Sequence, residues 1–161
     1  MTNDDKNGYT LIEILVALTI VGLIFGIGYV SFRDFARRQA VAGMARSIVG
    51  DLRLAQEQAL SGKKPSDIFC DSPGTLNGYN FRVVSSQNYV LEANCSGGNV
   101  QTKTVTIPSD LFISTPATNP ITFKILGEGT NLPVEGVTMN VTQRGTSHTR
   151  AISVSQSGKI K

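Results

Sequence analysis

The sequence predicts an α+β fold in which one long N-terminal helix packs on an antiparallel β-sheet. Apolar residues recur with helical spacing up to Leu60, and segments with a two-residue period fill the chain beyond Pro65. The chain has 161 residues, of which 40% are hydrophobic and 17% are charged. This length and composition are typical of one globular domain with one appendage and exclude an intrinsically disordered chain.

The first half of the expected helix is apolar enough to cross a membrane. The stretch from Ile14 to Phe32 contains no charged residue, and about 20 apolar residues span a hydrocarbon core. A secretory signal peptide is excluded, because its apolar core has only about 7–15 residues and a cleavage site of small residues follows it. We therefore expect one membrane-spanning segment over residues 9–32 and a soluble domain over residues 33–161.

The second half of the helix is amphipathic and is expected to continue to about residue 60. One face is polar, with Arg46, Gly50, Arg53 and Glu57. The opposite face carries an apolar stripe with spacings of three and four: Val41, Met44, Ala45, Ile48, Leu52, Ala55 and Ala59. Ser61 and Gly62 then supply a helix stop signal. The stripe requires a sheet to cover it.

Seven segments with strand character follow, from about residue 79. They are residues 79–84, 88–93, 102–107, 111–114, 121–126, 137–142 and 150–155. Turn-forming residues separate them, for instance at 96–99 and 127–129. The connections are too short for crossover helices, so the sheet is expected to be antiparallel.

Glu13 lies inside the apolar run, where a carboxylate costs about 2–3 kcal/mol. The helix turn around it offers no Lys or Arg. A countercharge could come from another copy of the chain, in particular from an α-amino group made by cleavage after Gly8. Alternatively, the carboxyl group lies at the membrane interface, where it reaches water or is protonated.

The residues from Gly8 to Leu15, with the sequence GYTLIEIL, resemble the class III signal of type IV prepilins and type II secretion pseudopilins. The resemblance implies that residues 1–8 are a leader peptide. Prepilin peptidase would cut between Gly8 and Tyr9 and methylate the new N-terminus of Tyr9, and Glu13 would act in assembly. The implied partners are the peptidase, other pilin or pseudopilin subunits, an inner-membrane assembly platform, and membrane lipid before assembly.

A second resemblance, to the GspH/FimT branch of minor pilins and pseudopilins, rests on Phe32–Phe35, Asp51–Ala55 and the chain end at Ser157–Ile160. It implies a structural subunit of a type IV pilus or of a type II secretion pseudopilus. Such a subunit is first anchored in the cytoplasmic membrane with its C-terminal domain outside, and then enters a periplasmic or cell-surface filament.

The charges that flank the apolar run predict the opposite topology. Arg33, Arg37 and Arg38 follow the run and only Lys6 precedes it, which favours a cytoplasmic C-terminal domain. Long domains can be translocated despite such a bias, and we therefore expect the domain outside. A signal-anchored domain that is never cleaved stays open as a further alternative.

Four cations and no acid lie between Gly136 and the chain end: Arg144, Arg150, Lys159 and Lys161. If this segment is one extended strand, Ser153, Lys159 and Lys161 share a face that could contact phosphates. Some FimT-like pilins bind DNA through a C-terminal Gly-Arg-x-Arg, which Gly158–Lys161 resembles with lysine in place of arginine. DNA binding during natural transformation is therefore an alternative function. An edge strand protected by lysines explains the same residues.

Cys70 and Cys95 would form a disulfide in an oxidising compartment, and two buried free thiols are the alternative. We expect no enzyme, no cofactor and no metal site. His148 is the only histidine, and two cysteines cannot supply a four-ligand site on their own. The net charge of +3 is too small to indicate a polyanion partner by itself.

Overall fold

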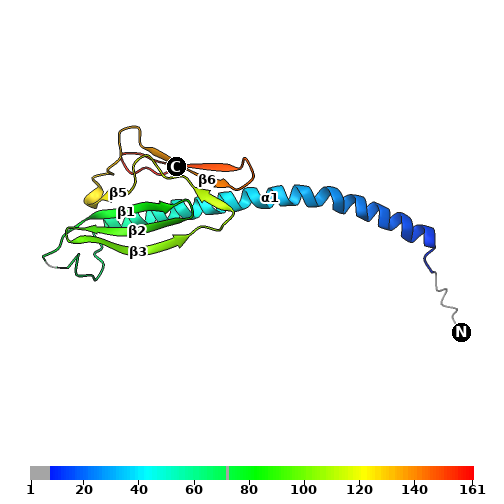
Figure 1. The fold of residues 1–161 in the computed structure, drawn as a ribbon, viewed down its shortest axis with the longest axis horizontal. Helices are drawn as coiled ribbons and strands as arrows, with labels where there is room; N and C mark the ends of the chain where they lie inside the picture. The colour runs from blue at the N-terminus through cyan, green and yellow to red at the C-terminus, as the bar shows by residue number, and fades with distance from the viewer. Residues whose placement is uncertain (1–7, 72) are drawn as a thin grey trace. The chain divides into compact units, whose positions relative to one another are not determined.

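The computed structural model describes residues 8–71 and 73–161, without the side chains of residues 27–30. The expected leader, residues 1–8, therefore lies outside the described residues except for Gly8. The chain forms two compact units, one up to Arg38 and one from Gln39 to Lys161 (Figure 1). The elements are α1 (Leu11–Leu60), β1 (Leu76–Ser85), β2 (Asn88–Cys95), β3 (Gly98–Thr106), β4 (Leu111–Ile113), β5 (Ile121–Lys124), the 3-10 helix η1 (Ile125–Gly127), β6 (Val137–Gln143) and β7 (Thr149–Val154).

Helix α1 ends at Leu60, as the sequence predicts. Gly62 adopts a left-handed conformation with φ of 61°. The N–H of Gly62 donates to the carbonyl of Ala59 at 3.2 Å, and the N–H of Lys63 donates to the carbonyl of Gln58 at 3.1 Å. These two bonds form a Schellman motif, which satisfies carbonyls that the helix end leaves free.

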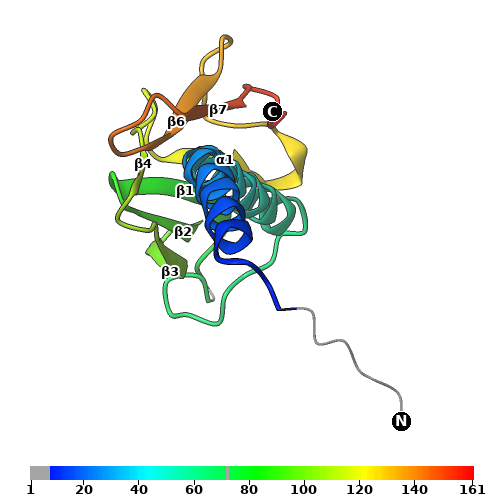
Figure 2. The same ribbon diagram turned by 90° about the vertical axis from the view of Figure 1, so that its right-hand side faces the viewer.

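The strands form two antiparallel sheets, with the orders β3-β2-β1-β5 and β4-β6-β7. Figure 2 looks along α1 and shows the two sheets on different sides of the helix. The α+β fold is confirmed, but the expectation of a single sheet is wrong. Proline-containing segments separate β3 from β4 and β4 from β5, and because proline lacks an N–H group it interrupts a ladder of hydrogen bonds.

The predicted apolar stripe of α1 is buried between the two sheets. Of its seven residues, only Met44 is partly exposed, and Ile48, Leu52, Ala55 and Ala59 have no exposed surface. The stripe packs into one core with strands of both sheets. In this core the rings of Phe81 and Tyr89 lie with their centroids 4.9 Å apart.

Two strand boundaries differ clearly from the prediction. Strand β1 begins at Leu76 rather than near residue 79, with an irregularity in its register between Leu76 and Gly78. Strand β3 begins at Gly98 rather than at residue 102, because only Ser96 and Gly97 form the turn that follows β2. Strand β3 lies at a sheet edge and is largely exposed, so its polar residues do not show the alternating pattern of a half-buried strand.

Candidate functional site

The N-terminal motif lies at the start of α1. Gly8 and Tyr9 precede the helix, and both are exposed. The hydroxyl oxygen of Thr10 accepts a hydrogen bond from the backbone N–H of Glu13 at 3.3 Å. Thr10 is therefore the N-cap of α1, and the Thr-x-x-Glu spacing is that of a capping box. Glu13 also places a negative charge in the first turn, where the helix dipole favours it.

The sequence prediction missed this local role of Glu13. It treated the carboxylate only as a charge in an apolar run that needs a partner in another chain. The signal was present in the spacing of three residues between Thr10 and Glu13 just before a long apolar run.

The apolar half of α1 is unburied along its described length. Between Leu11 and Phe25, all large hydrophobic side chains are at least 46% exposed. By length and composition α1 could cross a membrane, and none of its most apolar window is covered by the described chain. This surface requires lipid or other apolar helices around it.

Cys70 and Cys95 form a disulfide, with their Cα atoms 5.2 Å apart. The bridge ties the loop that follows α1 to the end of β2. In the same region, the N–H of Gly97 donates to the carbonyl of Phe69 at 3.3 Å. The loop around residue 70 is thus fixed to the four-stranded sheet at two points.

The C-terminal segment is not one extended strand, yet Ser153, Lys159 and Lys161 still line one hollow, together with Ser155, Val154 and Glu135. Strand β7 ends at Val154, and the chain turns back so that Ser153 and Lys161 exchange two backbone hydrogen bonds of 3.0 Å. The turn contains Gly158, which has a φ of 82°. A glycine of this kind favours a reversal of the chain over a continued strand.

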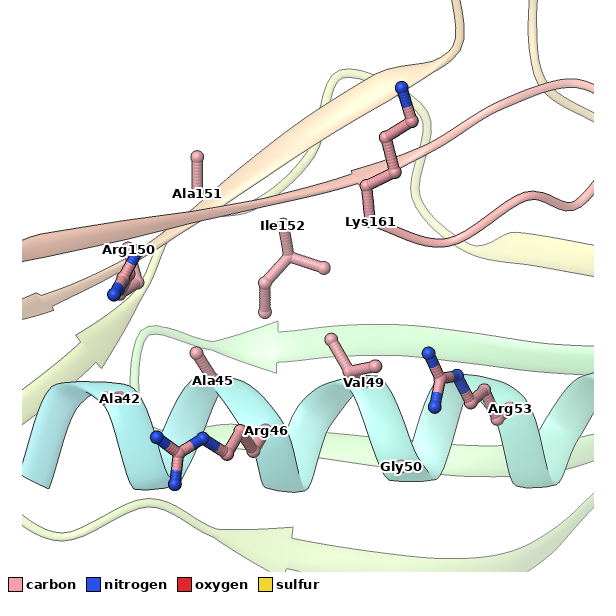
Figure 3. Close-up of a pocket in the computed structure, with 10 residues that line it drawn as sticks. All are labelled: Ala42, Ala45, Arg46, Val49, Gly50, Arg53, Arg150, Ala151, Ile152 and Lys161. Atoms are coloured by element: carbon pink, nitrogen blue, oxygen red, sulfur yellow. The ribbon is translucent and has the colours of Figure 1, made fainter. Parts of the chain in front are cut away.

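The reversal distributes the four predicted cations over more than one surface. Arg150 and Lys161 line a groove of about 390 Å³ between α1 and β7 (Figure 3). Lys159 does not line this groove, but it lines a second hollow that it shares with Lys161 and Glu135. The guanidinium of Arg144 lies 4.7 Å from the centre of the Phe112 ring. The four predicted cations therefore do not share one hollow, although Lys161 lines both the groove with Arg150 and the hollow with Lys159.

The groove gains two cations that the sequence analysis had assigned only to the polar face of a helix. Arg46 and Arg53 of α1 line it opposite Arg150 and Lys161. The other lining residues are Ala42, Ala45, Val49, Gly50, Ala151 and Ile152. Four cationic residues therefore line the groove and none of its lining residues is acidic, although the side chain of Lys161 points away from α1 in Figure 3.

A buried carboxylate is a further feature that the sequence analysis missed. Asp51 is 6% exposed. Its two oxygens accept hydrogen bonds from the Tyr89 hydroxyl at 2.8 Å and from Lys103 Nζ at 2.6 Å. Burial, and then the bond to Asp51, raise the pKa of the Tyr89 phenol above its ordinary value. Tyr89 therefore stays protonated and donates at neutral pH.

A second buried acid, Glu92, pairs with Arg82 across the β1–β2 hairpin. The hydrogen bond from Arg82 to Glu92 raises the pKa of the guanidinium. Both buried acids are therefore matched by a cation from a neighbouring strand. Each of these acids is thus ion-paired, and the contacts of Asp51 tie α1 to β2 and β3.

In residues 8–71 and 73–161, no group of three or more His, Cys, Asp or Glu side chains is placed to hold a metal ion. His148 lies between β6 and β7 and is partly exposed.

Two family models match the chain. Residues 3–29 match the prokaryotic N-terminal methylation motif, and residues 44–158 match the type II transport protein GspH. No curated protein and no solved structure matches the chain. The GspH match covers more than half of the sequence, and the methylation motif coincides with the capped start of α1. The chain therefore belongs to the GspH family of type II transport proteins, and it carries the N-terminal signal of type IV prepilins.

Proposed function

We propose that this chain is a structural minor pilin or pseudopilin subunit that is cut, methylated and then assembled through its N-terminal helix. Prepilin peptidase cuts between Gly8 and Tyr9 and methylates Tyr9. Residues 9–32 then anchor the subunit in the cytoplasmic membrane until the inner-membrane assembly platform transfers it to a type IV pilus or a type II secretion pseudopilus. The observation that carries the proposal is an uncovered apolar helix that starts at a methylation motif and continues into a GspH domain.

The role proposed for Glu13 is to pair with the α-amino group of a neighbouring processed subunit. A carboxylate in an apolar layer is costly unless it is paired. A match between one carboxylate and one amine at fixed heights would set the axial register of adjacent helices. Apolar contacts would supply most of the stabilisation, since they are not directional.

The proposed topology places the C-terminal domain outside the cytoplasmic membrane. The Cys70–Cys95 disulfide supports this side, because disulfides persist in oxidising compartments. The arginines after the apolar run favour the other side, so the topology needs its own measurement. Oxidation of Cys70 and Cys95 in intact cells, and its loss in a strain without periplasmic thiol oxidation, would support the outside location. Reduced thiols in wild-type cells would contradict it.

Processing is tested by the intact mass of the protein recovered from its filament. The expected mass lacks residues 1–8 and includes one added methyl group. Recovery of the uncut chain in the filament would refute processing and leave a signal-anchored domain.

The assembly role of Glu13 is tested by two substitutions that separate charge from capping. Glu13→Gln removes the charge but keeps a side chain that suits a capping box, whereas Glu13→Leu removes both. We expect both variants to insert in the membrane and to be cut, and both to be at least about tenfold depleted in filaments, as a lost pairing of about 1.4 kcal/mol implies. Normal incorporation of Glu13→Gln would show that the charge has no role in register.

A second candidate function is contact with DNA, and the observation that favours it is the acid-free groove lined by Arg46, Arg53, Arg150 and Lys161. The test is salt-dependent retention of DNA by the unit Gln39–Lys161. Arg150→Ala/Lys161→Ala should reduce both retention and its salt dependence. Lys124→Ala is the matched control, because Lys124 is exposed and lines neither the groove nor the hollow that Lys159 and Lys161 share. Equal effects of the two variants, or no retention by the wild type, would remove this candidate.

A further inference from the structure

The turns of α1 that end the apolar run combine cations with aromatic rings. Residues 32–38 have the sequence FRDFARR, with three arginines and one aspartate, so their net charge is +2. The three arginines are exposed or partly exposed. Phe32 is 68% exposed, and Phe35 is 58% exposed. We call residues 32–38 the basic-aromatic segment.

The cations of this segment match the height of one lipid headgroup layer. Along α1, the uncharged stretch from Ile14 to Phe32 rises by about 27 Å, close to the thickness of about 30 Å of a hydrocarbon core. The stretch from Arg33 to Arg38 rises by about 7.5 Å more. A headgroup layer is about 5–7 Å thick, since a bilayer with both layers measures about 40–45 Å.

The positive charge is confined to this height. The next seven residues, 39–45, contain no charged side chain. The cations are thus gathered in one short stretch instead of being spread along the helix. Such a cluster of one sign directly beside a membrane segment favours a partner of the opposite sign at the membrane surface.

The one acid of the segment is already held by a cation. The carboxylate of Asp34 accepts a hydrogen bond from Arg38 Nε at 2.9 Å, one helix turn away. Arg33 and Arg37 are four positions apart and therefore lie on one side of the helix. Because a guanidinium has five N–H donors, each of these arginines can bind a phosphate beside any contact that it makes within the helix.

The two aromatic rings distinguish a phospholipid from a free anion. Phe32 and Phe35 are three positions apart and share another side of the helix. Phenylalanine favours the boundary between headgroups and acyl chains. A phosphate ion would leave both rings in water, whereas a phospholipid offers a phosphate and an acyl chain at adjacent depths.

We propose that the basic-aromatic segment binds the phosphate groups of anionic phospholipids and holds α1 at a fixed depth in the membrane. Arg33 and Arg37 contact the phosphates, and Phe32 and Phe35 lie among the acyl chains next to them. The proposed topology places this contact in the outer leaflet of the cytoplasmic membrane. The leaflet therefore rests on the proposed function, whereas the lipid contact rests on the segment itself.

The test is quenching of a single tryptophan in the full chain, reconstituted in phosphatidylcholine bilayers. The chain contains no tryptophan, so Phe35→Trp introduces one reporter within the segment. Tyr9→Trp is the matched reporter at the other end of the apolar run, where residues 1–8 have no excess of cationic side chains. Brominated phosphatidylglycerol and brominated phosphatidylcholine are compared as quenchers, which yields the relative association constant of the two lipids at each reporter.

We expect the Phe35→Trp reporter to prefer phosphatidylglycerol at least about fivefold, which is the contribution of about one arginine at an anionic surface. The preference at the Tyr9→Trp reporter should stay below about twofold. No preference at Phe35→Trp, or equal preferences at the two ends, would overturn the proposal. So would loss of the preference on addition of inorganic phosphate at constant ionic strength, because the segment would then bind a free anion.

Charge variants in the Phe35→Trp background identify the residues. Arg33→Gln/Arg37→Gln brings the net charge of the segment to zero and should lower the preference to less than about twofold. Arg33→Lys/Arg37→Lys should keep most of it, since lysine retains the charge. Lys63→Gln/Lys124→Gln is the matched control, because it removes the same charge from exposed positions outside the segment. An equal loss in this control, or an unchanged preference in Arg33→Gln/Arg37→Gln, would overturn the proposal.

The distribution of the chain between membrane and filament fractions tests the proposed function separately. An intact Cys70–Cys95 bridge shows that a variant has folded. Filaments that contain the chain, with no lipid preference in bilayers, would overturn this inference and leave the proposed function standing. A lipid preference in a chain that never enters filaments would do the reverse. Loss of Arg33→Gln/Arg37→Gln from filaments with an unchanged lipid preference would assign the arginines to a protein partner and overturn the inference.

Discussion

The contacts of Asp51 predict that removing the Tyr89 hydroxyl lowers the free energy of unfolding more than removing a comparable hydroxyl elsewhere in the core. Tyr89 has no exposed surface, and its hydroxyl donates to one of the two oxygens of a buried carboxylate. In Tyr89→Phe that oxygen loses its donor, and only the bond from Lys103 remains. A hydrogen bond to a charged group contributes about 1.5–3 kcal/mol, so we expect the free energy of unfolding to fall by about 2 kcal/mol.

Tyr79→Phe is the matched control. Tyr79 is 1% exposed, and its hydroxyl donates at 2.6 Å to the backbone carbonyl of Lys63. This acceptor is neutral, so the expected loss is only about 1 kcal/mol. Urea unfolding of the unit Gln39–Lys161, with its disulfide intact, measures both losses, and similar m-values show that both variants unfold from comparably folded states.

The comparison has a definite refuting result. Equal losses for the two variants, or a larger loss for Tyr79→Phe, would show that the Asp51 carboxylate does not depend on Tyr89. A double-mutant cycle with Lys103→Met adds a second criterion. Because Tyr89 and Lys103 bind the same carboxylate, their effects should differ from additivity by at least about 0.5 kcal/mol.

Three other predictions concern stability. Because burial raises the pKa of Tyr89 above its ordinary 10.0, the phenol ionises at a lower pH in the unfolded chain than in the folded one. The free energy of unfolding, measured by urea titration, should therefore fall as pH rises above about 10. This fall should be less steep in Tyr89→Phe. Cys70→Ala/Cys95→Ala should cost about 3 kcal/mol in the same assay, from the loop entropy that the bridge removes, and a negligible change would refute this estimate. Gly158→Ala should cost about 1–3 kcal/mol, because φ is positive and the new Cβ would lie 2.8 Å from a side-chain amide of α1. Gly145→Ala, at a positive φ in open space, should cost less, and a thermal melt that ranks the two glycines otherwise would contradict the packing argument.

The long helix and its buried stripe could be predicted because their signals are local. Apolar residues at spacings of three and four identify the buried face of α1 whatever covers it, and Gly62 marks its end. The division of the strands into two sheets could not be predicted in the same way. The division depends on which strand β5 pairs with. Strand β5 pairs with β1, and more than 30 residues of intervening chain separate the two strands.

The Asp51 contacts and the groove could not be predicted for the same physical reason. Asp51 follows Ile48 by three residues and lies on the buried side of α1, yet its partners come from β2 and β3. The groove joins residues near 46–53 with residues near 150–161. A residue type and its spacing show which side of an element it occupies, whereas the partner on that side depends on tertiary pairing. For the C-terminal cations, the pattern did indicate charge, but the turn at Gly158 decided which surface each cation joins.

The capped start of α1 changes the argument about Glu13. Thr10 already fixes the first turn through the N–H of Glu13, and the carboxylate of Glu13 lies where the helix dipole favours a negative charge. Cleavage after Gly8 would place a positive amine on Tyr9, next to the same helix end, where the dipole disfavours it. Glu13 would then offset an unfavourable charge whether the amine belongs to its own chain or to a neighbour. Thr10→Ala separates these cases. If capping within one chain dominates, it should impair assembly as strongly as Glu13→Leu while Glu13→Gln has little effect, whereas a register set between chains should leave Thr10→Ala subunits assembling nearly as well as the wild type.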